Sequence, residues 1–383
     1  MIARYADRWI WVMDGDNDRG ILSYNEALPW SEALIERHAD RWDWEGLSSN
    51  EFLPWSEKLI EHYVDRWNWD GFLGLSQNET LPWSEKLIAR YADRWNWRHL
   101  SFNKSLPWSE ALIDHFSDRW GWSWLCLNKA LPWSEALIAR YATRWDWKSL
   151  SCCIALPWSE ALIARYADRW DWGYLSGNET LPWSEALIMR YSDRWHWGGG
   201  GRNTIQKMGL SGNKSLPWSE ALIERYVDRW DWDYLSGNET LPWSEALILH
   251  YSDRWSWGQY GFSRNQGLPW SEALIERYVD RWDWYELSSN TALPWSEALI
   301  EHFADQWKWN RLAWNTSFPW SERLVEKYWG RIDRDNNAFQ VKDISSEFPI
   351  FRCAGEKDLS CFNLTRQQVE ELLEWCFGQS LGK

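Results

Sequence analysis

Several features that often reveal a protein's function are scarce in this sequence of 383 residues. No run of roughly 18 apolar residues occurs, so the sequence predicts no transmembrane helix. Only six cysteines and seven histidines are present, and no spacing between them matches a zinc site. Basic residues are outnumbered, 41 Lys and Arg against 56 Asp and Glu. The formal net charge of −15 disfavours a surface for nucleic acids or other polyanions.

The few cysteines do not form the pattern of a disulfide framework. Cys126, Cys152 and Cys153 replace or neighbour residues that are Ser or Asn in related segments. This indicates drift in a reducing compartment, and we expect a cytoplasmic protein. The first nine residues resemble the latter half of the repeat described below and not a signal peptide. The chain therefore either begins inside a repeat or is part of a longer protein.

Tryptophan, by contrast, is abundant, at 40 residues, because one segment is repeated along the chain. Eight of the eleven intervals between successive Pro-Trp tryptophans are 25 residues. These tryptophans are Trp30, Trp55, Trp83, Trp108, Trp133, Trp158, Trp183, Trp218, Trp243, Trp270, Trp295 and Trp320. A unit of about 25 residues buries its apolar side chains only against its neighbours, so twelve copies predict an elongated solenoid.

The first half of the repeat has the pattern of a helix. In the copy at 156–180, Leu162, Tyr166 and Trp170 follow one another at intervals of four residues. This spacing places an apolar stripe on one side of a helix. The helix begins either at Pro157, which lacks an N–H, or after Ser159 as the N-cap, and the sequence leaves both starts open.

A shorter second helix is predicted to follow. Asp171 is a good N-cap, Trp172 and Leu175 lie three residues apart, and Asn178 has the position of a turn residue. We expect Trp158, Trp170 and Trp172 to form the interior between stacked copies. Their indole N–H groups need partners, and the nearby Asp, Ser and Asn side chains could accept them.

The segment 171–178 resembles a short repeat, Asp-Trp-x-x-Leu-Ser-x-Asn, of giant-virus and some bacterial proteins that have no assigned biochemistry. The likeness recurs over residues 22–320, although the Leu-Pro-Trp-Ser block departs from the pattern. This resemblance implies an all-α solenoid and no particular function. The alternative is a leucine-rich-repeat-like α/β solenoid, since Leu175 and Asn178 match part of its signature. That repeat also needs an apolar residue two positions before the Leu, where this chain has Glu45, Arg98, Lys148, Gly173 and Asp233.

The two ends of the chain differ from the repeats. We expect a partial N-terminal repeat with an insertion over 1–27, the solenoid over 28–330, and a capping segment over 331–383. The capping segment contains a predicted helix that opens with a capping box at Thr365–Gln368.

Variation between copies is concentrated after the Trp-x-Trp motif, where every length change also falls. Insertions on one edge of a rigid scaffold are candidate binding loops, although the edge could equally well only tolerate length. The candidate binding residues at this insertion edge are Phe72, Gly198, Gly199, Gly200, Gly201, Arg202 and Tyr260.

No residue of the repeats is singular in the way that a catalytic residue usually is, so we expect neither an enzyme nor a cofactor or metal. The sequence favours a scaffold that binds a protein or peptide through its variable edge and loops. Binding of a glycan or small ligand by exposed aromatic side chains is the alternative. We expect no nucleic acid and no membrane as a partner, and the oligomeric state stays open.

Overall fold

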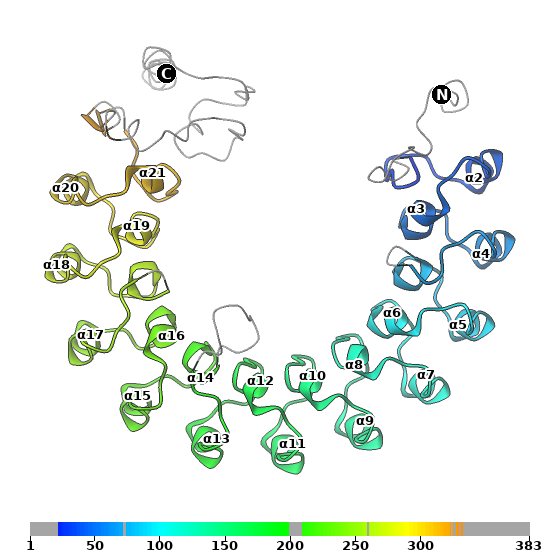
Figure 1. Ribbon diagram of the computed structural model, residues 1–383, viewed down its shortest axis with the longest axis horizontal. Helices are drawn as coiled ribbons and strands as arrows, with labels where there is room; N and C mark the ends of the chain where they lie inside the picture. Colours follow the sequence, from blue (N-terminus) through cyan, green and yellow to red (C-terminus); the bar gives the residue numbers. More distant parts are fainter. Residues whose placement is uncertain are drawn as a thin grey trace, which may run out of the picture. The chain divides into compact units, whose positions relative to one another are not determined.

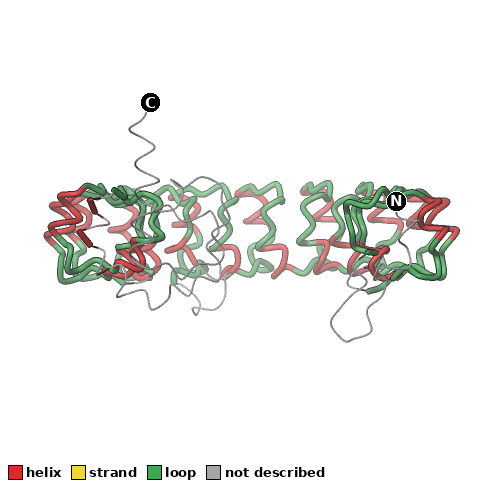
Figure 2. Tube along the Cα trace, turned by 90° about the horizontal axis from the view of Figure 1, so that it is seen from above, coloured by secondary structure: helices red, strands yellow, loops and turns green. Residues whose placement is uncertain are grey.

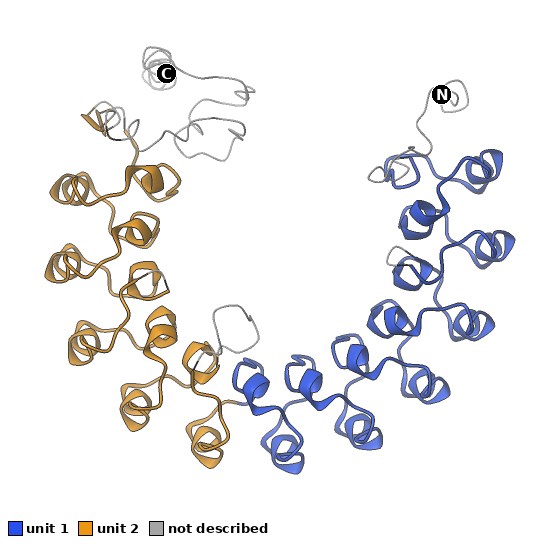
Figure 3. Cartoon of the chain, viewed as in Figure 1, with its two compact units in different colours: residues 1–182 blue, residues 183–383 orange. Residues whose placement is uncertain are grey.

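The computed structural model describes residues 22–71, 74–198, 209–258 and 260–321, with 323–324, 327–328 and 331. Within these residues it contains the α-helices α2 to α21, two 3₁₀ helices and no strand (Figure 2). The chain divides into two compact units between Pro182 and Trp183 (Figure 3). Each unit repeats one pair of helices, so the predicted α-solenoid is confirmed. The leucine-rich alternative, which needs strands, is wrong for the described residues.

Eleven copies of the helix pair are described, and within each unit the first helices form one row and the second helices another (Figure 1). The first helices are α2 (Glu32–Arg37), α4 (Glu57–His62), α5 (Glu85–Arg90), α7 (Glu110–His115), α9 (Glu135–Arg140), α11 (Glu160–Arg165), α13 (Glu185–Arg190), α15 (Glu220–Arg225), α17 (Glu245–His250), α18 (Glu272–Arg277) and α20 (Glu297–His302). The second helices are α3 (Trp44–Ser49), η2 (Leu75–Gln77), α6 (Trp97–Phe102), α8 (Trp122–Leu125), α10 (Trp147–Ser151), α12 (Trp172–Ser176), α14 (Gly209–Gly212), α16 (Trp232–Gly237), η3 (Phe262–Arg264), α19 (Trp284–Leu287) and α21 (Trp309–Leu312).

Serine begins the first helices, which settles the choice that the sequence left open. In α11 the Ser159 hydroxyl accepts a hydrogen bond from the Leu162 N–H at 3.0 Å, and Pro157 lies outside the helix. The helix ends at Arg165, so it is shorter than the apolar stripe suggests. A turn follows, in which the Trp170 N–H bonds to the Tyr166 carbonyl at 3.3 Å and brings the indole back over the helix.

The tryptophans stack between copies, as predicted. Trp170 is buried, and its ring centroid lies 5.0 Å from Trp158 of its own copy and 4.8 Å from Trp147 of the preceding copy. Burying one indole removes about 150–250 Å² from water, which contributes on the order of 4–6 kcal/mol before conformational entropy is counted. The repeated aromatic contacts therefore supply the main driving force for stacking.

Most indole N–H groups of the described residues bond to main-chain carbonyls and not to the Asp, Ser and Asn side chains that sequence proximity suggested. Trp170 donates to the Ile163 carbonyl at 3.1 Å, and Trp172 donates to the Ala167 carbonyl at 3.0 Å. The prediction was wrong because the first helix and the turn after it present main-chain carbonyls to the rings. The polar side chains are thereby left for contacts between copies.

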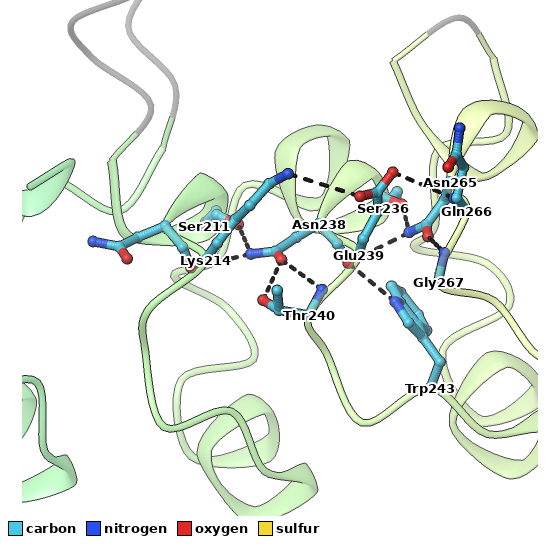
Figure 4. A network of polar contacts seen from close by, with 11 residues as sticks. Ser211, Lys214, Ser236, Asn238, Glu239, Thr240, Trp243, Asn265, Gln266 and Gly267 are labelled. Atoms are coloured by element: carbon cyan, nitrogen blue, oxygen red, sulfur yellow. Dashed lines mark hydrogen bonds and ion pairs between the residues drawn. The ribbon is translucent and has the colours of Figure 1, made fainter. Parts of the chain in front are cut away.

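Buried asparagines link most of the described copies to the one before. The Asn238 amide nitrogen donates to the carbonyls of Ser211 and Asn213, at 3.3 and 3.2 Å, and its oxygen accepts from the Thr240 N–H (Figure 4). Asn265 repeats the arrangement one copy further on. A buried donor that satisfies two carbonyls is costly to remove, so this asparagine does more than terminate a turn.

The serine of the Leu-Ser-x-Asn motif forms a second link. In unit 1 the Ser151 hydroxyl donates to the Trp147 carbonyl at 2.6 Å and accepts from the Asp171 N–H of the next copy at 2.9 Å. Arginines add a surface link, as when Arg66 donates to the Ala39 carbonyl and pairs with Asp40 at 2.7 Å. Exposed ion pairs of this kind contribute little on their own, about 0–1 kcal/mol each.

Candidate functional site

The second half of the repeat carries two positions that differ from copy to copy and are exposed in most copies, and we call their residues the variable face. Gly173, Gly198, Gly258, Thr291 and Asn310 are its half-buried members. One position follows Trp-x-Trp and the other follows the buried asparagine. In unit 1 the variable face consists of Glu45, Asp70, Arg98, Ser123, Lys148 and Gly173, with Glu51, Glu79, Lys104, Lys129, Ile154 and Glu179. In unit 2 it consists of Gly198, Asp233, Gly258, Tyr285 and Asn310, with Lys214, Glu239, Gln266, Thr291 and Thr316.

One hydrogen bond explains why every insertion falls on this face. In a copy without an insertion the Leu175 N–H donates to the Asp171 carbonyl at 2.9 Å, four residues back. In two of the copies with insertions, Leu210 donates to His196 at 2.9 Å and Phe262 donates to Ser256 at 2.9 Å. Since the bond persists, Leu210 and Phe262 are buried in the core in the same way as Leu175, and the insertion leaves this part of the packing in place.

Glycine is required where the longest insertion re-enters the repeat. Gly209 has a φ of +57°, and a Cβ there would lie 2.3 Å from the Gly198 carbonyl oxygen. Such an approach excludes any side chain. Gly198, a predicted binding residue, is itself packed, since its Cβ would lie 3.2 Å from a carboxylate oxygen of Asp231. The other predicted residues of these loops, Phe72, Gly199, Gly200, Gly201 and Arg202, lie outside the described residues.

Tyr260, the last of the predicted binding residues, lines a cavity in unit 2. The cavity has a volume of about 350 Å³, and the Tyr260 ring at its edge is 60% exposed. The residues that line it come from four successive copies and are mostly polar. They are Gly237, Glu239, Tyr260, Gly261, Arg264, Asn265, Gln266, Glu286, Ser289, Asn290 and Arg311. The sequence indicated only the tyrosine, because the other side chains come from different copies.

Charges of both signs line this cavity. The Glu286 side chain is almost fully buried, and its carboxylate lies 3.5 Å from the guanidinium of Arg264. Arg311 donates to the Ser289 hydroxyl at 2.9 Å, and Glu239 pairs with Lys214 at 3.7 Å (Figure 4). The cavity thus offers hydrogen-bond donors and acceptors beside an aromatic ring, a combination suited to a polar ligand or a peptide.

Comparisons with protein-family models, with curated proteins and with solved structures found no match to this chain. No helix among the described residues is both long enough and apolar enough to cross a membrane. The site must therefore be interpreted from its own geometry.

Proposed function

We propose that the chain is an interaction scaffold that binds a protein or peptide through the variable face. The observation that carries the proposal is the polar cavity in unit 2, which lies at the insertion edge and exposes Tyr260. The constant residues of the repeat are occupied in contacts between copies, whereas the variable face meets solvent. A rigid frame that carries changing surface residues is typical of repeat proteins that bind other chains.

A glycan or another small polar ligand is the second candidate. Tyr260 stands beside the carboxylates of Glu239 and Glu286, and an aromatic ring next to carboxylates suits a sugar. The packing of most tryptophans favours the first candidate. Their rings lie against other rings between copies, as Trp147 does against Trp170, so they are not available to stack on a sugar.

Affinity capture with quantitative mass spectrometry tests the proposal. The Tyr260→Ser/Gln266→Ala variant changes two exposed residues of the cavity edge, and Met189→Ser/Leu249→Ala changes two exposed residues of the first-helix row of the same unit. We expect the cavity variant to lose a captured protein that the intact chain and the control variant both retain. Identical sets from all three proteins would contradict the proposal.

Titration of intrinsic fluorescence with an array of soluble glycans separates the two candidates. If the chain binds a peptide or protein, we expect no glycan to change the fluorescence of the intact chain more than it changes that of the Tyr260→Ser variant. A saturable change that disappears in Tyr260→Ser would instead favour the glycan.

A further inference from the structure

The charge of the variable face of unit 1 changes from negative to positive over three consecutive copies. At the position after Trp-x-Trp, Glu45 and Asp70 are followed by Arg98, Ser123 and Lys148. At the position after the asparagine, Glu51 and Glu79 are followed by Lys104, Lys129 and Ile154, and then by Glu179. We call Arg98, Lys104, Lys129 and Lys148 the basic patch. It lies along α6, α8 and α10, which follow one another in the second-helix row (Figure 1).

The four cations of the basic patch lack carboxylate partners. Many arginines of the chain pair with a carboxylate of the preceding copy, as Arg144 does with Asp118 at 2.6 Å. In the described part of the chain, no carboxylate oxygen lies within 4.0 Å of a patch cation. Arg98 instead lies over the Trp124 ring, 4.4 Å from its centroid. In a chain of net charge −15, this local positive charge is left for a partner to neutralise.

Apolar side chains are exposed in the same three copies. Phe102, Leu127 and Ile154 are 43%, 38% and 48% exposed. Phe102 and Leu127 precede the buried asparagine, where other copies of unit 1 have Ser49 and Gln77. In these three copies the surface therefore combines cations that have no carboxylate partner with exposed apolar side chains.

We infer that the basic patch and these apolar side chains dock an acidic polypeptide segment that carries apolar side chains of its own. The inference rests on the proposed function and specifies the chemistry of the partner. Carboxylates of the segment neutralise the four cations, while its apolar side chains cover Phe102, Leu127 and Ile154.

A nucleic acid fits this surface less well. Nucleic-acid-binding surfaces cluster many Lys and Arg, whereas this patch has four cations in a chain of net charge −15. The Trp124 ring is covered by Arg98 and contacted by Phe102, with centroids 6.2 Å apart, so its face is occupied where a base would stack.

A random peptide library displayed on phage and selected on the intact chain identifies the ligand class, and fluorescence anisotropy of the selected peptides measures affinity. Two charge-matched variants are compared. Lys104→Glu/Lys129→Glu cancels the net positive charge of the patch and installs the residue that Glu51 and Glu79 already provide in other copies. Lys58→Glu/Lys86→Glu makes the same change on exposed first-helix positions. Circular dichroism verifies that both variants keep the fold.

We expect selected peptides rich in Asp or Glu together with Leu or Phe. The patch variant should weaken them by about tenfold or more, and the control variant by less than about threefold. Suppose instead that the selected peptides are neutral or basic, bind the patch variant as tightly as the intact chain, and fail to bind Tyr260→Ser/Gln266→Ala. That result would overturn this inference and leave the proposed function standing. Binding of an oligouridylate in place of any peptide, lost in the patch variant, would also overturn it. If the library yields no peptide and the affinity capture yields no partner, both proposals fail.

Discussion

The two halves of the repeat differ in what they tolerate. The first half keeps its length and nearly all its residues from copy to copy, and its helices start at the same serine. The second half accepts insertions and replaces its surface residues, yet it retains a buried Leu or Phe and, in most copies, the Ser and Asn that bond to neighbouring copies. The difference teaches that residues in contact with the next copy stay the same along the chain, whereas residues in contact with solvent are free to vary.

The largest expected effect comes from removing a tryptophan between copies. Trp170→Ala deletes a buried ring that contacts Trp158 and Trp147, and we expect a loss of about 3–5 kcal/mol in the free energy of unfolding. Denaturant titration followed by circular dichroism measures it. Phe52→Ala, at an aromatic side chain that is 54% exposed, is the control and should change stability by less than about 0.5 kcal/mol. Equal losses would abolish the distinction between the two kinds of position.

The next effect concerns the constant asparagine of the variable half. Asn178→Ala removes the amide that donates to the carbonyls of Ser151 and Cys153 at 3.1 and 3.4 Å. Because two buried carbonyls lose this donor, we expect a loss of about 2–3 kcal/mol by the same titration. Glu179→Ala, at the exposed neighbouring position, should cost less than about 0.5 kcal/mol. An Asn178 variant as stable as the parent would mean that the asparagine only terminates the turn.

One boundary between copies has neither the serine link nor the asparagine link; the Cys126 thiol instead donates to the Asp146 carbonyl of the next copy at 3.6 Å. Restoring the two links should stabilise the chain. Cys126 replaces the serine and Cys153 the asparagine where the copy of α8 meets the copy of α10, and both are buried free thiols. Burial raises the pKa of the Cys126 thiol, so it remains neutral at physiological pH. We expect Cys126→Ser/Cys153→Asn to gain about 1 kcal/mol, seen as a higher denaturation midpoint. A lower midpoint would show that the sulfur atoms pack better than the polar links they replace.

The smallest expected effect is a pH dependence at high pH. Burial, with a hydrogen bond to Glu224, raises the pKa of Tyr251 to about 12 from an ordinary 10.0. The unfolded chain loses this proton first, so the stability contribution is complete below pH 10 and is lost as the pH rises toward 12. Tyr251→Phe, which installs the residue found at Phe116 and Phe303, should flatten that part of the stability profile. Parallel profiles for both proteins between pH 10 and 12 would refute the assignment.

Much of the fold could be predicted because its signals are local in sequence. The interval of 25 residues, the Asp171 cap and the apolar pair of Trp172 and Leu175 were enough to define two helices and their stacking. The early end of the first helix at Arg165 was missed, because no Gly or Pro marks it. The partners of the asparagines and indoles were missed as well, since main-chain carbonyls have no residue-type signal.

The candidate site was predictable only in part. Copy-to-copy variation predicted the insertion edge and Tyr260, and the structure places Tyr260 at the edge of a cavity there. The pairing of the buried Glu286 carboxylate with the exposed Arg264 could not be predicted, because the two residues lie 22 positions apart across a copy boundary whose geometry only the fold defines.

The polar links between copies reach back only a short way along the chain. Asp171 bonds to a residue 20 positions earlier, and Asn178 to residues 25 and 27 positions earlier. During synthesis, the surface against which a new copy packs has therefore already left the ribosome when that copy emerges. Each copy can assemble on its predecessor at once, so a nascent chain is at every stage a finished shorter solenoid with one exposed end.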